Sequence, residues 1–155
     1  MKTILILAAL AMVPVSAQYS TPMRDVDNVG RNPTAFTANF SVAGSAFSGS
    51  VNLPAVPSGK RLVIDHITIN GMLFPTDTAS IALTMTSGGS LVLHYLPFPH
   101  VGSIGSLDLC VGTFPVTFVA DPGSTVNVVF ARNQTNYSLT ASYTVSIAGH
   151  YVTLP

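Results

Sequence analysis

The stretch from Val56 to Gly71 constrains the fold of this chain more than any other. Its Pro57-Ser58-Gly59 segment is a turn, because proline presets φ and glycine accepts conformations that other residues avoid. The strand predicted over residues 62–69 is rich in β-branched residues and lacks a helical period. Because apolar residues occupy both alternating positions, we expect a central strand with both faces covered. Asn70-Gly71 predicts the turn that ends it.

Two polar residues interrupt this apolar strand. We expect Asp65 and His66 to form a hydrogen-bonded pair, or to point one into each face of the sheet. The interpretation is structural, because isolated polar residues on a strand are usually satisfied by a neighbour.

The rest of the chain alternates apolar and polar residues and shows no helical period of useful length. The alternation predicts three hairpins: residues 34–42 with 47–53, 81–86 with 90–98, and 115–120 with 126–130. It also predicts a short strand, a long strand and an irregular loop, over residues 107–112, 139–151 and 97–106. The fold class is therefore all-β: a single β-sandwich or jelly-roll-like domain over residues 34–155, with about eight or nine antiparallel strands.

The beginning of the chain has the pattern of an export signal. Residues 1–17 combine one early charge, a short apolar run and small residues before a cleavage point, so they read as a signal peptide cut between Ala17 and Gln18. The apolar run is too short for a stable membrane span. Residues 18–33 are predicted to form an extended or mobile arm. We therefore expect a secreted protein, extracellular or periplasmic.

Charge and cysteine content exclude several classes of protein. The chain has six basic and six acidic residues, and cleavage would remove only the base Lys2, so no basic stripe is available for nucleic acid. Cys110 is the single cysteine, which rules out an internal disulfide. Its apolar surroundings predict a buried, inert thiol.

Three segments together resemble a family of small secreted bacterial proteins of uncharacterised function. They are Val56-Pro57-Ser58-Gly59-Lys60-Arg61-Leu62-Val63-Ile64-Asp65, the Ala120-Asp121-Pro122-Gly123-Ser124 turn, and Ser146-Ile147-Ala148-Gly149-His150-Tyr151-Val152. The resemblance covers most of the chain from about Phe47 onward. It implies export and a β-sandwich, and it implies no catalytic residues.

No catalytic, cofactor-binding or metal-binding residue is predicted, and no cofactor. The chain contains no nucleophile elbow and no phosphate-binding glycine loop. Two alternatives stay open. One is a metal-dependent, cupin-like enzyme using His94 and His100, out of the four histidines His66, His94, His100 and His150. The other is a glycan-binding module centred on Tyr137.

The leading hypothesis is a secreted, non-enzymatic β-sandwich that acts by surface binding or assembly. The partner is unknown. An exposed edge strand or the arm over residues 18–33 could pair with another copy or with an extracellular partner.

Overall fold

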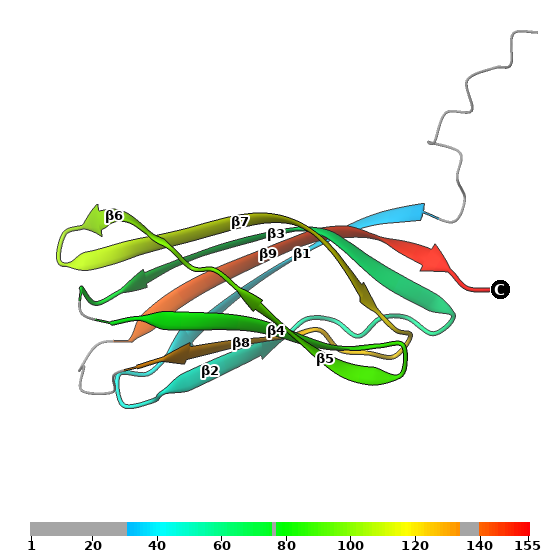
Figure 1. Ribbon diagram of the computed structural model, residues 1–155, viewed down its shortest axis with the longest axis horizontal. Coiled ribbons are helices and arrows are strands. Elements are labelled where there is room, and N and C mark those ends of the chain that lie inside the picture. The colour runs from blue at the N-terminus through cyan, green and yellow to red at the C-terminus, as the bar shows by residue number, and fades with distance from the viewer. Residues whose placement is uncertain (1–30, 76, 134–139) are drawn as a thin grey trace, which may run out of the picture.

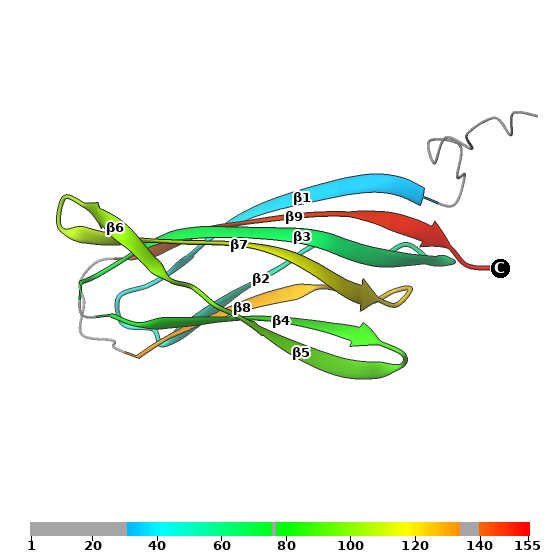
Figure 2. The same cartoon turned by 45° about the horizontal axis from the view of Figure 1, so that its top comes forward.

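The computed structural model describes residues 31–75, 77–133 and 140–155, and in this part of the chain every regular element is a strand. Two antiparallel sheets lie face to face (Figures 1 and 2). The five-stranded sheet has the order β1-β9-β3-β7-β6, and the four-stranded sheet the order β2-β8-β4-β5. The all-β sandwich predicted from the sequence is therefore confirmed. The strands are β1 (Arg31–Val42), β2 (Ser48–Asn52), β3 (Lys60–Leu73), β4 (Ala79–Ser87), β5 (Ser90–Leu96), β6 (His100–Ile104), β7 (Leu107–Ala120), β8 (Asn127–Arg132) and β9 (Ala141–Thr153).

The core lies between the sheets and contains a group of packed aromatic rings. The ring centroid of Phe130 on β8 lies 3.6 Å from that of Tyr143 on β9. Phe40 on β1 lies 5.4 Å from Tyr143, and Phe98 lies 6.2 Å from both Phe130 and Tyr143. Phe98 belongs to the segment that crosses from β5 to β6, so this contact anchors the crossing to the core.

Strand β3 is central in its sheet, as predicted, but the expectation that both its faces are covered is wrong. Leu62 and Ile64 are buried, and so are Ile67 and Ile69, although the two pairs differ in parity. The pairing with β9 explains the change: Ile64 lies opposite Gly149 and the next pair is His66 with Ala148, so Asp65 is one extra residue. The bulge reverses the alternation of side chains in the second half of β3. The apolar residues on either side of the bulge therefore point to the same face of the sheet.

Gly149 makes room for the bulge. A Cβ atom at this position would collide with the backbone carbonyl of Val63 on β3. The close approach of the two backbones therefore requires glycine on β9.

Two of the three predicted hairpins are wrong. β4 and β5 pair as expected, but β1 pairs with β9 and β2 with β8. Likewise β7 pairs with β3 and β6, whereas β8 pairs with β2 and β4. The turns after β1 and β7 carry the chain from one sheet to the other. Two strands that face one core from opposite sheets show the same alternation as a hairpin, so the pattern could not separate the two arrangements.

The predicted loop over residues 97–106 and the predicted break inside residues 107–120 are also wrong. β6 forms a hairpin with the start of β7, and β7 continues as one strand through Pro115. Among the described strands, β6 pairs with β7 only as far as Cys110. β7 is thus an edge strand at Pro115, where a residue without an N–H is tolerated.

The predicted N-terminal segments lie almost wholly outside the described residues. β1 begins at Arg31, inside the range expected for the arm, and residues 1–30 are not described. Within the described ranges there is no helix long and apolar enough to cross a membrane.

The bulge on β3 makes a first prediction. Gly149→Ala should lower the free energy of unfolding by about 2–3 kcal/mol, because the new methyl group meets backbone that cannot move aside. Gly102→Ala on β6 is the control, since a Cβ atom there meets nothing within 4 Å. Urea denaturation followed by circular dichroism measures both. Equal stability of the two variants would contradict the proposed role of Gly149.

Candidate functional site

The outward face of the four-stranded sheet carries no aspartate, glutamate, lysine, arginine or histidine side chain among the described residues. We call this surface the four-stranded face. The alternating burial and the strand pairing place its residues in rows across β2, β8, β4 and β5. Its members are Ser48, Ser50, Asn52, Ser80, Ala82, Thr84, Thr86, Leu91, Leu93, Tyr95, Asn127, Val129 and Ala131. The described charged residues lie on the five-stranded sheet, at the ends of the sandwich, or in its interior.

Three large apolar side chains project from this face along β5. Leu91 is 77% exposed, Leu93 48% and Tyr95 71%. Single exposed apolar residues are ordinary on a protein surface. A row of three on consecutive outward positions of one strand is a contiguous patch, which is typical of an interaction surface.

β5 is also an edge strand, since it pairs with β4 alone among the described strands. Natural edge strands usually carry a charge, a proline, a bulge or a short length that discourages pairing with another chain. The other edges have such features: β2 and β6 are short, β1 contains Pro33 and packs beside β2, and the part of β7 beyond its pairing with β6 contains Pro115. β5 has seven residues without proline, glycine or charge.

Contacts at several points hold β5 in place. On its inward side, the ring of His94 stacks on Phe118 of β7, with centroids 3.8 Å apart and planes 11° from parallel. At the turn before it, the backbone N–H of Gly89 donates to Asp121 Oδ2 at 2.8 Å. Asp121 also lies 3.4 Å from Arg61 on β3. The strand is therefore fixed in an extended form, and no described strand pairs with its outer edge.

Sequence reasoning missed this surface. The alternation separates Leu91, Leu93 and Tyr95 from Val92, His94 and Leu96, but both sets are largely apolar. Only the position of β7 decides which set is covered. The sequence feature that could have indicated this surface is a strand that is apolar on both faces and has no charged residue.

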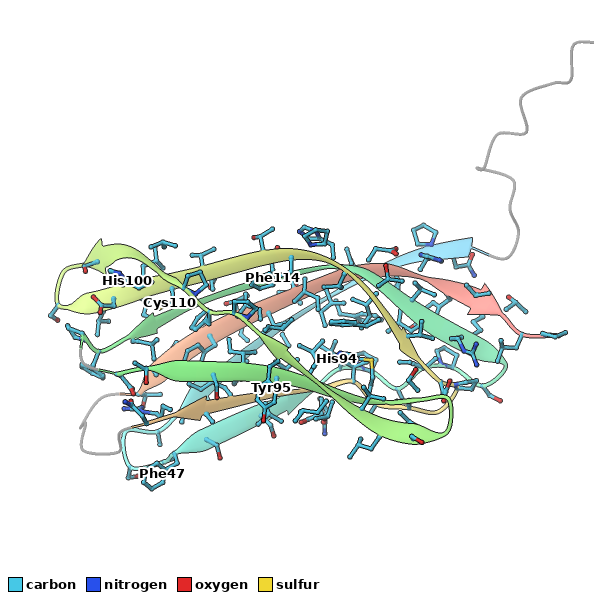
Figure 3. All side chains as sticks on the ribbon, in the orientation of Figure 1. Phe47, His94, Tyr95, His100, Cys110 and Phe114 are labelled. Atoms are coloured by element: carbon cyan, nitrogen blue, oxygen red, sulfur yellow. The ribbon has the colours of Figure 1, made fainter. Side chains whose placement is uncertain are left out.

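The structure does not bring His94 and His100 together, as the metal-enzyme alternative would require. His100 is the first residue of β6, at the open end of the β6–β7 hairpin and away from His94 (Figure 3), with its Nε2 atom 3.3 Å from Asp108 Oδ1. His150 contacts Asp65, and the half-buried His66 lies on β3. Among the described residues, no group of three or more potential metal ligands is placed to hold an ion.

The other residues singled out in the sequence do not form a common site among the described residues either. Tyr137, the centre of the glycan-binding alternative, lies outside the described residues. Asp65 and His66 were expected to pair or to occupy opposite faces, which is wrong: Asp65 Oδ2 lies 2.8 Å from His150 Nδ1 on β9. The bulge places Asp65 on the outside of the sheet. Cys110 is buried, as predicted, and burial together with the nearby Asp108 raises the pKa of its thiol.

A buried ion pair lies at the end of β8. Arg132 Nε is 2.9 Å from Asp77 Oδ2, and both side chains are wholly inaccessible to solvent. Asp77 belongs to the segment between β3 and β4, so the pair ties that segment to β8. The pair lies close enough to Tyr143 to influence its hydroxyl. Burial raises the pKa of Tyr143, Arg132 lowers it, and Asp77 and Cys110 raise it further, with a net upward shift. The pair's complete burial marks it as a structural feature.

Comparisons with known proteins give no family. No family model matches the chain, and no curated protein matches it. Among solved structures, it is similar to a chain of the cyanophage Pam1 capsid asymmetric unit, at 16% identity and a TM-score of 0.47, covering 94% of this chain and 99% of that one. A chain from the structure of infectious bursal disease virus, Gx strain, is similar at 12% identity and a TM-score of 0.29, covering 81% and 41%. These two likenesses carry no argument about what this chain does.

The ion pair makes a second prediction. Asp77→Asn should lower the free energy of unfolding by about 3–5 kcal/mol, because it leaves the Arg132 charge buried without its counter-charge. Replacing both partners, Asp77→Leu with Arg132→Met, should recover much of that loss, since no buried charge remains. Urea denaturation of the three variants measures the coupling. A loss below about 0.5 kcal/mol in Asp77→Asn would show that the pair is not buried in solution.

Tyr143 makes a third prediction, about pH. Its folded pKa is raised above the ordinary value of about 10, so its contribution to stability is complete below pH 10 and is lost as pH rises further. The unfolded state then releases the phenolic proton that the folded state retains. Tyr143→Phe should show a smaller fall in unfolding free energy between about pH 9 and pH 11 than the wild type. An identical alkaline profile in both proteins would contradict the assignment.

Proposed function

We propose that this protein is a non-enzymatic β-sandwich that is exported and then acts by assembly with another protein chain. The observation that supports the proposal is the outer edge of β5, which pairs with no described strand. Leu91, Leu93 and Tyr95 are exposed along this strand, on a sheet face without charged residues. Water contact with these side chains is unfavourable, and a protein surface that covered them would gain about 25 cal/mol for each Å² removed from water.

The electrostatics of the four-stranded face favour a protein partner of similar character. A surface without cationic side chains cannot neutralise the charge of phosphate groups. It also demands no desolvation of ions when a partner covers it. The hydroxyl and amide groups on β4, β8 and β2 can form hydrogen bonds at the rim of a contact. Within the chain, Asn127 Nδ2 donates to Asn52 Oδ1 at 2.6 Å.

The assembly makes a fourth prediction. In light scattering after size-exclusion chromatography, the wild-type mass should rise above that of one chain as concentration increases. Leu93→Lys should remain at the mass of one chain, because it places a charge in the centre of the contact. Phe47→Lys is the matched control: Phe47 is 62% exposed and lies before β2, away from β5 (Figure 3), so this variant should assemble like the wild type.

Two results would contradict the proposal. If the wild type kept the mass of one chain at every concentration, the proposed assembly would be contradicted. A Leu93→Lys variant that assembles like the wild type would remove β5 from the contact. Circular dichroism of each variant confirms that the fold is retained.

A further inference from the structure

We infer that the partner of β5 is β5 of a second copy of this chain, paired antiparallel about Leu93. The inference rests on the proposed function and names its partner and register. It starts from the outer main-chain groups of β5, which pair with no described strand and can continue the ladder with another extended strand.

The register follows from the alternation of side chains. Opposed residues in an antiparallel pair lie on the same face, so an outward residue must oppose an outward residue. A two-fold axis at Leu93 meets this condition and pairs the whole strand from Ser90 to Leu96. Leu93 then lies opposite its own copy, and Leu91 lies opposite the second copy's Tyr95. Axes at residue 92 or 94 meet the same condition but leave two residues of the strand unpaired, and axes at 91 or 95 leave four unpaired.

The charge distribution supports a second copy. In a symmetric contact the residue on the axis lies opposite its own copy, so a charge near Leu93 would lie close to a like charge. β5 has none, and His94 is turned inward onto Phe118. The adjoining residues on β4 that face outward, Thr84 and Thr86, are also uncharged.

The surface area of the exposed side chains on β5 is too small for a stable interface without main-chain pairing. Three exposed side chains supply a few hundred Å², whereas a stable interface buries roughly 800 Å² on each partner. Strand pairing adds main-chain contacts along seven residues and joins two four-stranded sheets into one continuous sheet. The two-fold axis closes this arrangement at two copies. Pairing of β5 with a different edge would leave edges free and extend into a fibre.

Cysteine crosslinking tests the register. Opposed Cα atoms in such a pair lie about 4.5–5.5 Å apart, within the range that a disulfide spans. Under mild oxidation, Leu93→Cys alone should form a covalent dimer on a non-reducing gel. Leu91→Cys and Tyr95→Cys should each remain single chains alone and form the dimer when mixed. The wild type is the control, because its Cys110 is buried and should not crosslink.

Each other outcome overturns the inference in a distinct way. Leu91→Cys or Tyr95→Cys crosslinking alone as well as Leu93→Cys would exclude the register. Leu93→Cys crosslinking only when mixed with Thr37→Cys would make β1 the partner strand. A wild type that assembles while Leu93→Cys forms no covalent dimer would exclude the β5–β5 pairing and leave the proposed assembly standing. A wild type that never assembles would remove both.

Discussion

One extra residue on β3 sets the geometry of the sandwich. Asp65 interrupts the pairing with β9, and the parity of β3 changes there, so Leu62 and Ile64 point into the same core as Ile67 and Ile69. Without the bulge, a strand with this sequence would turn one apolar pair to solvent. Gly149 permits the arrangement because a larger residue would meet the β3 backbone. The five-stranded sheet therefore has one buried face and one exposed face.

The packing of the five-stranded sheet against the four-stranded sheet decides which side of β5 is buried. β7 lies over the inward side of β5 and covers His94 through the ring of Phe118, so the alternate residues of β5 must face water. A strand with apolar residues in both positions then has one apolar row inside and one outside. The exposed row lies on an edge strand that pairs with β4 alone among the described strands, which is why we propose that assembly occurs at β5.

The buried polar groups of Arg132, Asp77 and Tyr143 stabilise the fold. Arg132 and Asp77 are enclosed as a pair, and Tyr143 lies near them with its hydroxyl held neutral by burial. The described histidines have separate environments: His94 stacks on a ring, His100 and His150 each contact a carboxylate, and His66 lies half-buried on β3. The described histidines thus lie apart from one another, and we propose assembly through the uncharged face as the function of the protein.

The sequence by itself determined the fold class, the central position of β3, the β4–β5 hairpin and the burial of Cys110. Each follows from local alternation, turn residues or an apolar environment. Only the tertiary structure decided which strands pair, because β1 with β2 and β7 with β8 show hairpin-like patterns while lying in opposite sheets. It also decided that Asp65 is a bulge and that Leu91, Leu93 and Tyr95 are exposed. Alternation records which residues share a face, and long-range packing decides whether that face is covered.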